Sequence, residues 1–225
     1  MRIPREETSL RQRATQALRS AIFDGVFAPG QKLSERELCE LLDVSRTCVR
    51  ESLQHLQAEG LITIVPHRGP EVAVISAEEV RDIYAVRASL EELAVRGFVT
   101  VASAAQKAAL RSDVVALQTC QVGTPDKTTI LGIKNRFYET LIQGCGNMVV
   151  GQMLRQLNNR VTVLRRVSMA RPGRLAETTR ELDALVSAIE LGDEDRAAQL
   201  CCLHIRNSAE NALRNMQEAG LAAQG

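Results

Sequence analysis

The stretch LSERELCELLDVSRTCVRESLQHLQAEG, residues 33 to 60, decides the fold of the N-terminal part of the chain. Ser34 and Glu37 have the Ser-x-x-Glu spacing of a capping box, and leucines follow at helical spacing, which predicts a short helix. After a connection of only two residues, Ser45 can cap a second helix that carries a narrow apolar stripe. Two helices joined by so short a turn indicate a helix-turn-helix.

The flanking sequence completes a winged form of this motif. Residues 8 to 26 carry apolar side chains at helical spacing and are followed by a Pro-Gly break, so we expect one amphipathic helix before the motif. After the motif, LITIVPHRGPEVAVI, residues 61 to 75, contains two β-rich runs around a Pro-His-Arg-Gly-Pro turn. This pattern predicts a hairpin with His67, Arg68 and Gly69 at its tip.

The second helix of the motif begins with side chains suited to reading DNA. Arg46, Thr47 and Arg50 lie in and just after its first turn, the part of such a helix that faces base edges. The arginine fork matches the two acceptors of guanine. A pair of arginines is also typical of an ordinary solvated helix face. The ordered series of helix, capped helix, tight turn, arginine helix and hairpin favours DNA binding.

Composition bounds the protein class without identifying it. The 225 residues are 45% hydrophobic and 24% charged, which suits two small domains of an ordinary soluble protein. The formal net charge is +1, and residues 1 to 76 hold ten basic and ten acidic residues, so bulk charge does not indicate DNA. We find no signal peptide or membrane-length apolar run and expect a cytoplasmic protein. The six cysteines include no CxxC pair and are expected to be reduced.

Beyond about Ser76 the sequence predicts only helices. Turn-forming segments (GTPD, GCGN, ARPG and LGD) separate most of them. We therefore expect a mostly α fold, with a winged helix-turn-helix domain at residues 1 to 76 and a six-helix, bundle-like effector and dimerisation domain at 77 to 225. The predicted helices span residues 77–101, 103–122, 125–144, 146–170, 175–191 and 193–217.

One lysine breaks the pattern of its helix. In ILGIKNRFYETLI, residues 130 to 142, Lys134 falls in the middle of the apolar arc. Burying an ammonium without a partner is expensive, so the position needs an explanation. Either Lys134 presents its charge to an internal pocket, or its long stem lets it reach water from the edge of the arc.

The first half of the chain resembles the winged helix-turn-helix of GntR-type bacterial transcription regulators, over about fifty residues from LRSAIFDG to PHRG. The resemblance implies DNA contacts from the Ser-Glu-Arg-Glu-Leu segment, from the start of the recognition helix and from the wing. The candidate DNA-binding residues are therefore Arg36, Ser45, Arg46, Thr47, Arg50, His67, Arg68 and Gly69.

The second half resembles the all-helical ligand-sensing (FCD) domain of the FadR branch of this family, in its short VanR-like form. The segments that carry the likeness are IYAVRASLEELAV, RFYETLIQGCGN and RELDALVSAIELGDEDRAAQLCCLHI. In many relatives this domain holds a divalent metal, and the resemblance places the four ligand positions at Lys134, Tyr138, Leu182 and His204. Only the histidine is a strong metal ligand, so we expect neither a metal nor any other cofactor.

The same likeness suggests what replaces the metal. A lysine in its place would offer a fixed positive charge to a carboxylate-bearing effector, with the Tyr138 hydroxyl and His204 beside it and Arg87 lining the pocket. The alternative for His204 is an ordinary hydrogen-bonded core histidine. The candidate effector-binding residues are Arg87, Lys134, Tyr138, Leu182 and His204.

These observations predict a ligand-responsive regulator, expected to be a repressor, that acts as a homodimer on an inverted-repeat operator in double-stranded DNA. Its other partner would be a small organic acid, with no membrane involved. An enzyme carrying a helix-turn-helix is disfavoured because the second half holds no catalytic signature. A thiol-based redox regulator using Cys145, Cys201 or Cys202 remains an alternative.

Overall fold

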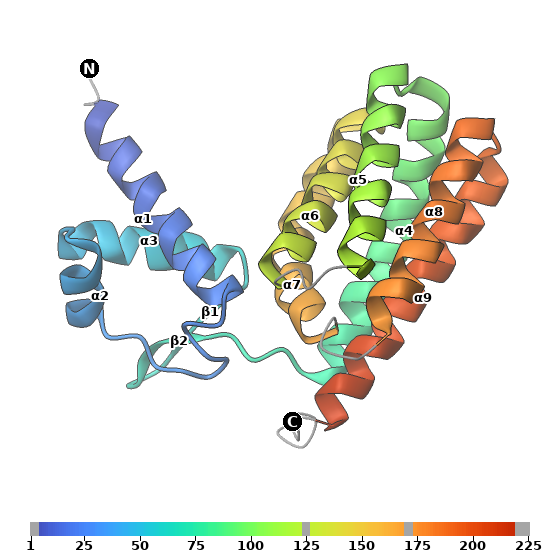
Figure 1. Cartoon of the computed structure of the whole chain (residues 1–225). Coiled ribbons are helices and arrows are strands. Elements are labelled where there is room, and N and C mark those ends of the chain that lie inside the picture. The colour runs from blue at the N-terminus through green and yellow to red at the C-terminus, as the bar shows by residue number, and fades with distance from the viewer. Residues whose placement is uncertain (1–4, 123–126, 169–172, 219–225) are drawn as a thin grey trace. The chain divides into compact units, whose positions relative to one another are not determined.

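The chain divides into two compact units, residues 1–75 and 76–225, which are described separately. The structure, a computed structural model, describes residues 5–122, 127–168 and 173–218 (Figure 1). Nine helices and one two-stranded sheet lie in these described residues. The expected mostly α fold is thereby confirmed.

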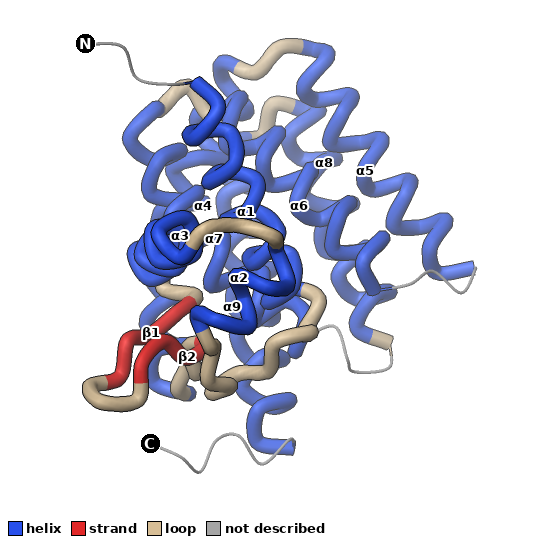
Figure 2. Tube along the Cα trace, turned by 90° about the vertical axis from the view of Figure 1, so that its left-hand side faces the viewer, coloured by secondary structure: helices blue, strands red, loops and turns tan. Residues whose placement is uncertain are grey.

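The first unit contains three helices and a hairpin: α1 (Arg5–Phe23), α2 (Glu35–Leu42), α3 (Arg46–Ala58), β1 (Ile62–Val65) and β2 (Gly69–Val72). Both α2 and β1 pack on α3, as does α1, and the two strands pair antiparallel (Figure 2). The core is formed by α1 and α3 side chains that are at most 1% exposed, together with the first residue of β1 and the residue before it. They include Leu18, Val49, Leu56, Leu61 and Ile62.

Two details of this unit differ from the sequence expectations. The first helix ends at Phe23 and not at Val26, because Gly25 adopts a left-handed conformation (φ 68°) that stops it. In the hairpin, Gly69 pairs with Val65 and so opens β2 instead of lying in the turn. The turn itself contains His67, which has a φ of 62°.

Serine caps fix where three helices begin. Ser34, Ser45 and Ser76 have extended backbones and precede α2, α3 and α4 (Ala77–Val101). Each hydroxyl accepts a hydrogen bond from the backbone N–H three residues further on, at 3.5, 3.2 and 3.1 Å. These contacts satisfy N–H groups that a helix start leaves without partners.

The second unit is a bundle arranged around α4, which packs along α9 and also contacts α6, α7 and α8 (Figure 1). Helix α5 packs on α6 and α8. The predicted bounds agree with these helices to within one or two residues; residues 125–126 and 169–170 lie outside the described ranges. In the described segments no helix is both long and apolar enough to cross a membrane. The further bounds are α5 (Ala104–Val122), α6 (Lys127–Gly144), α7 (Met148–Ser168), α8 (Arg174–Leu191) and α9 (Glu194–Glu218).

Candidate functional site

The outer face of α3 carries exposed polar side chains. Its apolar stripe faces α1 and the hairpin, with Val49 and Leu56 fully buried. The opposite side therefore faces solvent: Arg46 and Arg50 are 64% and 59% exposed, and Thr47 between them is also exposed. Such side chains can reach base edges in a DNA groove without any rearrangement of the protein core.

A carboxylate on α2 holds the two arginines of α3. The Nε of Arg50 lies 3.0 and 2.9 Å from the two carboxylate oxygens of Glu35, and the Nε of Arg46 lies 4.0 Å from the same group. These are surface ion pairs, which cost little to exchange for a phosphate or a base. Glu35 was not expected from the sequence, although its place at the first turn of α2 is favourable for an acid.

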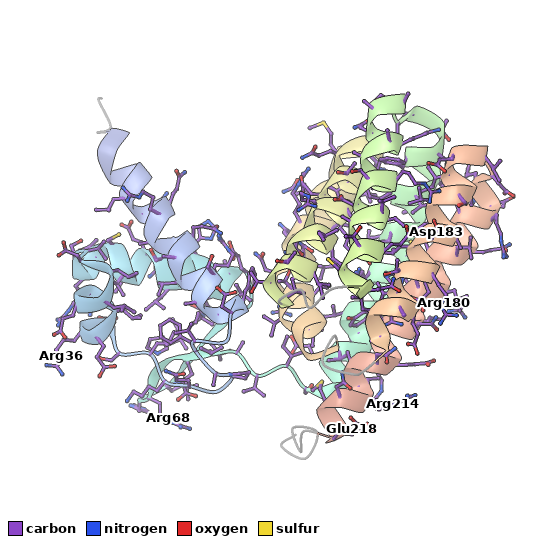
Figure 3. All side chains as sticks on the ribbon, in the orientation of Figure 1. Arg36, Arg68, Arg180, Asp183, Arg214 and Glu218 are labelled. Carbon is purple, nitrogen blue, oxygen red and sulfur yellow. The ribbon has the colours of Figure 1, made fainter. Side chains whose placement is uncertain are left out.

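The remaining candidate DNA contacts lie on α2 and on the hairpin. Figure 3 shows Arg36 extending from α2 and Arg68 from the turn between β1 and β2, both away from the core of this unit. Arg68 is 69% exposed and pairs with Glu71 at 3.2 Å. The hairpin is tied to the segment before α2, because the N–H of Leu33 donates to the carbonyl of Pro70 at 2.8 Å. His67 is exposed, and Ser45 caps α3.

The second unit, in contrast, buries charged side chains. In its described residues the buried cations are Arg87, Lys134 and Arg174, and the buried carboxylates are Glu91 and Asp113. Asp113 pairs at 2.9 Å with an exposed arginine on α6. Arg87 and Arg174 each have a carboxylate partner inside the unit, Glu91 and Glu181 respectively.

Arg87 is one of these buried cations and lies on α4. Its Nε donates to Glu91 at 2.5 Å, and the two side chains are 3% and 4% exposed. The guanidinium also lies over two aromatic rings, 4.8 Å from the centroid of Tyr138 and 5.4 Å from that of Tyr84. Cation–π contact and the ion pair together compensate for its lost hydration.

Tyr138 begins a chain of hydrogen bonds that crosses the unit. Its hydroxyl lies 2.8 Å from Nε2 of His204, and Nδ1 of that ring lies 2.5 Å from Glu181. The geometry fits a neutral imidazole that donates from Nδ1 and accepts from the tyrosine. Glu181 also accepts from Asn207 at 2.8 Å and from both terminal nitrogens of Arg174 at 3.2 Å.

The pKa values of this chain follow from burial and its neighbours. Burial lowers the pKa of His204 to about 4, against the raising effect of Glu181 and with a further lowering by the charge of Lys134. Burial alone would raise the pKa of Glu181, but its hydrogen bonds with His204, Asn207 and Arg174 lower it to about 2. The histidine is therefore neutral and the glutamate charged at neutral pH.

Lys134 lies inside the unit, 3% exposed. The interpretation that it reaches water from the edge of the apolar arc is therefore wrong. Lys134 lies one turn of α6 before Tyr138, and its charge lowers the pKa of His204. Three of the four positions that the resemblance assigned to metal ligands are therefore brought together. The fourth, Leu182, is fully buried on α8.

This group of residues does not fit a metal ion. Both ring nitrogens of His204 are already engaged, and lysine and leucine offer no lone pair that a divalent cation would take. No cluster of three or more His, Cys, Asp or Glu side chains in the described ranges has the proximity that a metal site needs. The positive charge here comes from Lys134 and the buried arginines.

A small cavity lies next to Tyr138, and neither Lys134 nor His204 lines it. Arg87, Glu91, Tyr138 and Asn158 line it together with apolar residues of α6 and α7, and its volume is about 10 Å³. This is about the room that one water molecule needs. An organic acid could contact Arg87 from this cavity only after the surrounding side chains move apart.

The cysteines do not resemble redox sensors. All six are free, and burial raises the pKa of the Cys201 and Cys202 thiols, with neighbouring glutamates adding to the effect. The thiol of Cys145 is buried and donates to the carbonyl of Asn147 at 3.4 Å. Reactive cysteines need an exposed thiolate with a lowered pKa. The redox alternative is therefore disfavoured.

Sequence reasoning missed three members of the buried network. Glu91 could have been found as the i+4 partner of Arg87 on one helix face. Glu181 directly precedes the candidate Leu182, yet it reads like any charged residue of an amphipathic helix. Arg174 carried no signal, because arginine next to a Pro-Gly break is normally solvated.

The two units together define a class: a winged helix-turn-helix with exposed arginines joined to a helical domain that buries a polar network. Comparison with known proteins agrees with this. Residues 10–72 match the model for bacterial regulatory proteins of the gntR family, and residues 82–207 match the FCD domain. The chain belongs to the GntR family of bacterial transcription regulators and carries a C-terminal FCD domain.

Individual relatives share nearly the whole chain. The HTH-type transcriptional regulator YdhC of Bacillus subtilis (strain 168) is 24% identical over 203 residues, 90% of each chain. The HTH-type transcriptional repressor RspR of Escherichia coli (strain K12) is 25% identical over 207 residues, 92% of this chain and 90% of RspR. The solved structure of E. coli McbR/YncC has a TM-score of 0.79 at 21% identity, covering 93% of this chain and 98% of that one. The protein is a DNA-binding transcription regulator and not an enzyme.

Proposed function

We propose that this regulator is a cytoplasmic repressor of the VanR-like branch that binds an inverted-repeat operator as a homodimer. A two-fold symmetric dimer presents two recognition helices and so reads a palindromic site. The relative RspR is a repressor, which supports the direction of control. The candidate DNA contacts are those on the α2, α3 and hairpin surface of the first unit: Arg36, Ser45, Arg46, Thr47, Arg50, His67, Arg68 and Gly69.

We further propose that a small organic acid binds inside the helical unit and changes operator affinity. The observation that carries this is the burial of Lys134, 3% exposed, one turn of α6 before Tyr138, whose hydroxyl lies 2.8 Å from His204. Lys134 supplies the fixed positive charge for the carboxylate, and the Tyr138 hydroxyl and Arg87 are further donors. His204 orients Tyr138, and Leu182 closes the apolar side.

The effect on DNA is a population shift. A ligand changes operator affinity only if it prefers one of two arrangements of the protein, and the coupling is reciprocal. The cavity beside Arg87 holds only about one water, so a ligand that reaches it selects an arrangement in which the side chains of α4, α6 and α7 stand further apart.

Operator selection and calorimetry test this function. Full-length protein should enrich a palindromic sequence from random double-stranded DNA, and its anisotropy titration with that operator should shift when the effector from a screen of small carboxylates is added. Elemental analysis of protein purified without chelator should show well under one equivalent of zinc, nickel or iron. Failure to enrich any sequence, or a stoichiometric metal lost on His204→Ala, would contradict the proposal.

A further inference from the structure

The outer side of α4 is uncharged over most of its length. Between residues 83 and 101, all of which the structure describes, no exposed residue is charged, although Lys, Arg, Asp and Glu make up 24% of the chain. Exposed helix faces normally carry charged residues, as α9 does with Arg214 and Glu218 (Figure 3). The exposed residues of this part of α4 are Ala85, Val86, Ser89, Leu93, Thr100 and Val101.

Helix α7 packs beside α4 and runs in the opposite direction. Glu79, near the start of α4, pairs at 2.7 Å with Arg160, in the second half of α7. At the other end, a methyl group on Gly146, just before α7, would lie 2.7 Å from Val101, the last residue of α4. The two helices are therefore neighbours along nearly the whole of α4.

The exposed residues of α7 are also mainly uncharged. Within residues 148–164, the part of α7 whose side chains the structure describes, the one exposed charge is Arg155, which pairs with Glu139 of α6 at 3.1 Å. The other exposed residues of this part are Met148, Val149, Gln152, Met153 and Gln156.

The apolar residues of the two helices form one continuous face. Leu90, which has an exposed apolar residue one turn away on either side along α4, packs on a buried cluster that includes Val150 and Leu154 of α7. Each of these two follows an exposed apolar residue of α7 in the chain. We define the α4–α7 face by its exposed apolar residues, which are 48% to 91% exposed: Val86, Leu93, Val101, Met148, Val149 and Met153.

We propose that the α4–α7 face binds the same face of a second copy of this chain; the inference rests on the homodimer proposed above and names its interface. A two-fold interface brings one surface against its own copy, so a face with charges of one sign would repel itself. A face without charge avoids this repulsion. Depletion of charge together with enrichment of methionine is typical of the centre of a protein interface.

The size of the face is sufficient for a dimer. At 1.5 Å per residue, residues 83–101 of α4 are about 28 Å long and residues 148–160 of α7 about 20 Å, and a helix is about 10 Å wide, so the face covers roughly 500 Å² in each copy. Pairing two copies covers roughly 1,000 Å² in total, which is about the area that a specific interface needs. Protruding side chains add to this area.

The buried side of the same helix pair lines the small cavity next to Tyr138. Its lining includes Arg87 and Glu91 of α4 and Leu154 and Leu157 of α7. A ligand that separated these helices to enter the cavity would also displace the residues of the α4–α7 face. The proposed effector and the contact between the two copies therefore act on the same pair of helices.

Sedimentation velocity of the full-length protein over a range of concentrations tests the proposal. Leu93→Glu places a charge in each of the two paired faces, so the dissociation constant of the dimer should rise by about 100-fold or more. Met153→Glu repeats the test from α7. Leu203→Glu is the matched control, because it makes the same change on α9 at a leucine that is 46% exposed, against 54% for Leu93. It should leave the constant at the parent value, and circular dichroism should show parental helix content in all three variants.

The outcomes separate this inference from the proposed function. If the parent is a monomer at every concentration and also on a palindromic operator, the proposed homodimer is wrong, and the interface with it. If the parent is a dimer and both Leu93→Glu and Met153→Glu keep its dissociation constant, the homodimer stands but the α4–α7 face is not its interface. Dissociation of Leu203→Glu alone would likewise overturn the inference, because it would place the interface on α9.

Discussion

Arginine has opposite roles in the two units of this regulator. In the first, Arg46 and Arg50 are 64% and 59% exposed and pair with one surface carboxylate. In the second, Arg87 and Arg174 are 3% and 1% exposed and are surrounded by carboxylates, hydroxyls and aromatic rings. Exposed arginines can exchange partners at little cost, which suits reading DNA. Buried ones are committed to a fixed geometry, which suits recognition of one small ligand.

The largest expected effect tests the buried side of this comparison. Arg174→Met keeps most of the stem and removes the guanidinium that pairs with Glu181, so it should lower the free energy of unfolding by about 3 to 5 kcal/mol. Arg214→Met, at an exposed position one helix away, should change it by less than about 0.5 kcal/mol. Urea denaturation followed by circular dichroism measures both. Equal changes in the free energy of unfolding for the two variants would mean that the buried contacts of Arg174 do not stabilise the fold.

The second-largest expected effect is the destabilisation of the buried network by acid. His204 binds a proton near pH 6.5 in the unfolded chain but near pH 4 in the folded one, so between these values the unfolded state binds more protons. The free energy of unfolding should therefore fall by about 2 to 3 kcal/mol as the pH is lowered from 6.5 toward 4. Glu181, whose pKa is lowered from 4.5 to about 2, extends the loss below pH 4.5.

Histidine variants separate this effect from general acid sensitivity. His204→Gln should remove most of the loss between pH 6.5 and 4, whereas His67→Gln in the exposed hairpin turn should retain it. Urea titrations at pH 7 and pH 4.5 are sufficient. An identical pH dependence in the parent and His204→Gln would show that this histidine is not the group responsible.

Substitution of the exposed arginines of α3 should change the affinity for DNA and not the stability of the fold. Arg46→Ala and Arg50→Ala should each weaken binding to a selected operator by roughly 5- to 150-fold at fixed salt. The unfolding midpoints of both variants should stay at the parent value. The control variant Arg206→Ala in the helical unit should bind the operator with the affinity of the parent. Anisotropy titration measures the affinities, and parental affinity in both α3 variants would contradict the recognition-helix assignment.

The smallest expected effect concerns Glu35. Glu35→Gln keeps the shape of the side chain but releases Arg50 from its ion pair and removes a negative charge next to the exposed arginines of α3. We expect affinity for non-operator DNA to rise by about threefold, with a smaller gain for the operator, so the ratio of the two affinities falls. Titration with operator and scrambled duplexes at the same salt measures this ratio. An unchanged ratio would show that Glu35 does not position Arg50.

The sequence predicted the elements of both units well because local signals determine them. Serine caps, Pro-Gly breaks and helical spacing of apolar residues all act within a few residues. Lys134 was recognised as anomalous for the same reason, since a charge inside an apolar arc is a local pattern.

The partners in the buried network could not be predicted in this way. His204 meets Tyr138 from 66 residues away and Glu181 from 23 residues away, and nothing in the local sequence specifies those pairings. Arg174 is likewise buried by α9 packing against it. The hairpin differs from the sequence prediction only at Gly69, which was expected in the turn but lies in β2. The pairing register of the two strands decides which residues form the turn, and the sequence does not show that register.

The most direct test of the account is the effector affinity of Lys134→Met. This change keeps the stem and removes the charge that we propose replaces the metal, so affinity for a carboxylate effector found by screening should fall by about 2 to 5 kcal/mol. Calorimetric titration of the two proteins with the same effector gives the answer: a large loss supports a regulator that senses anions through a buried lysine, and equal affinities would contradict it.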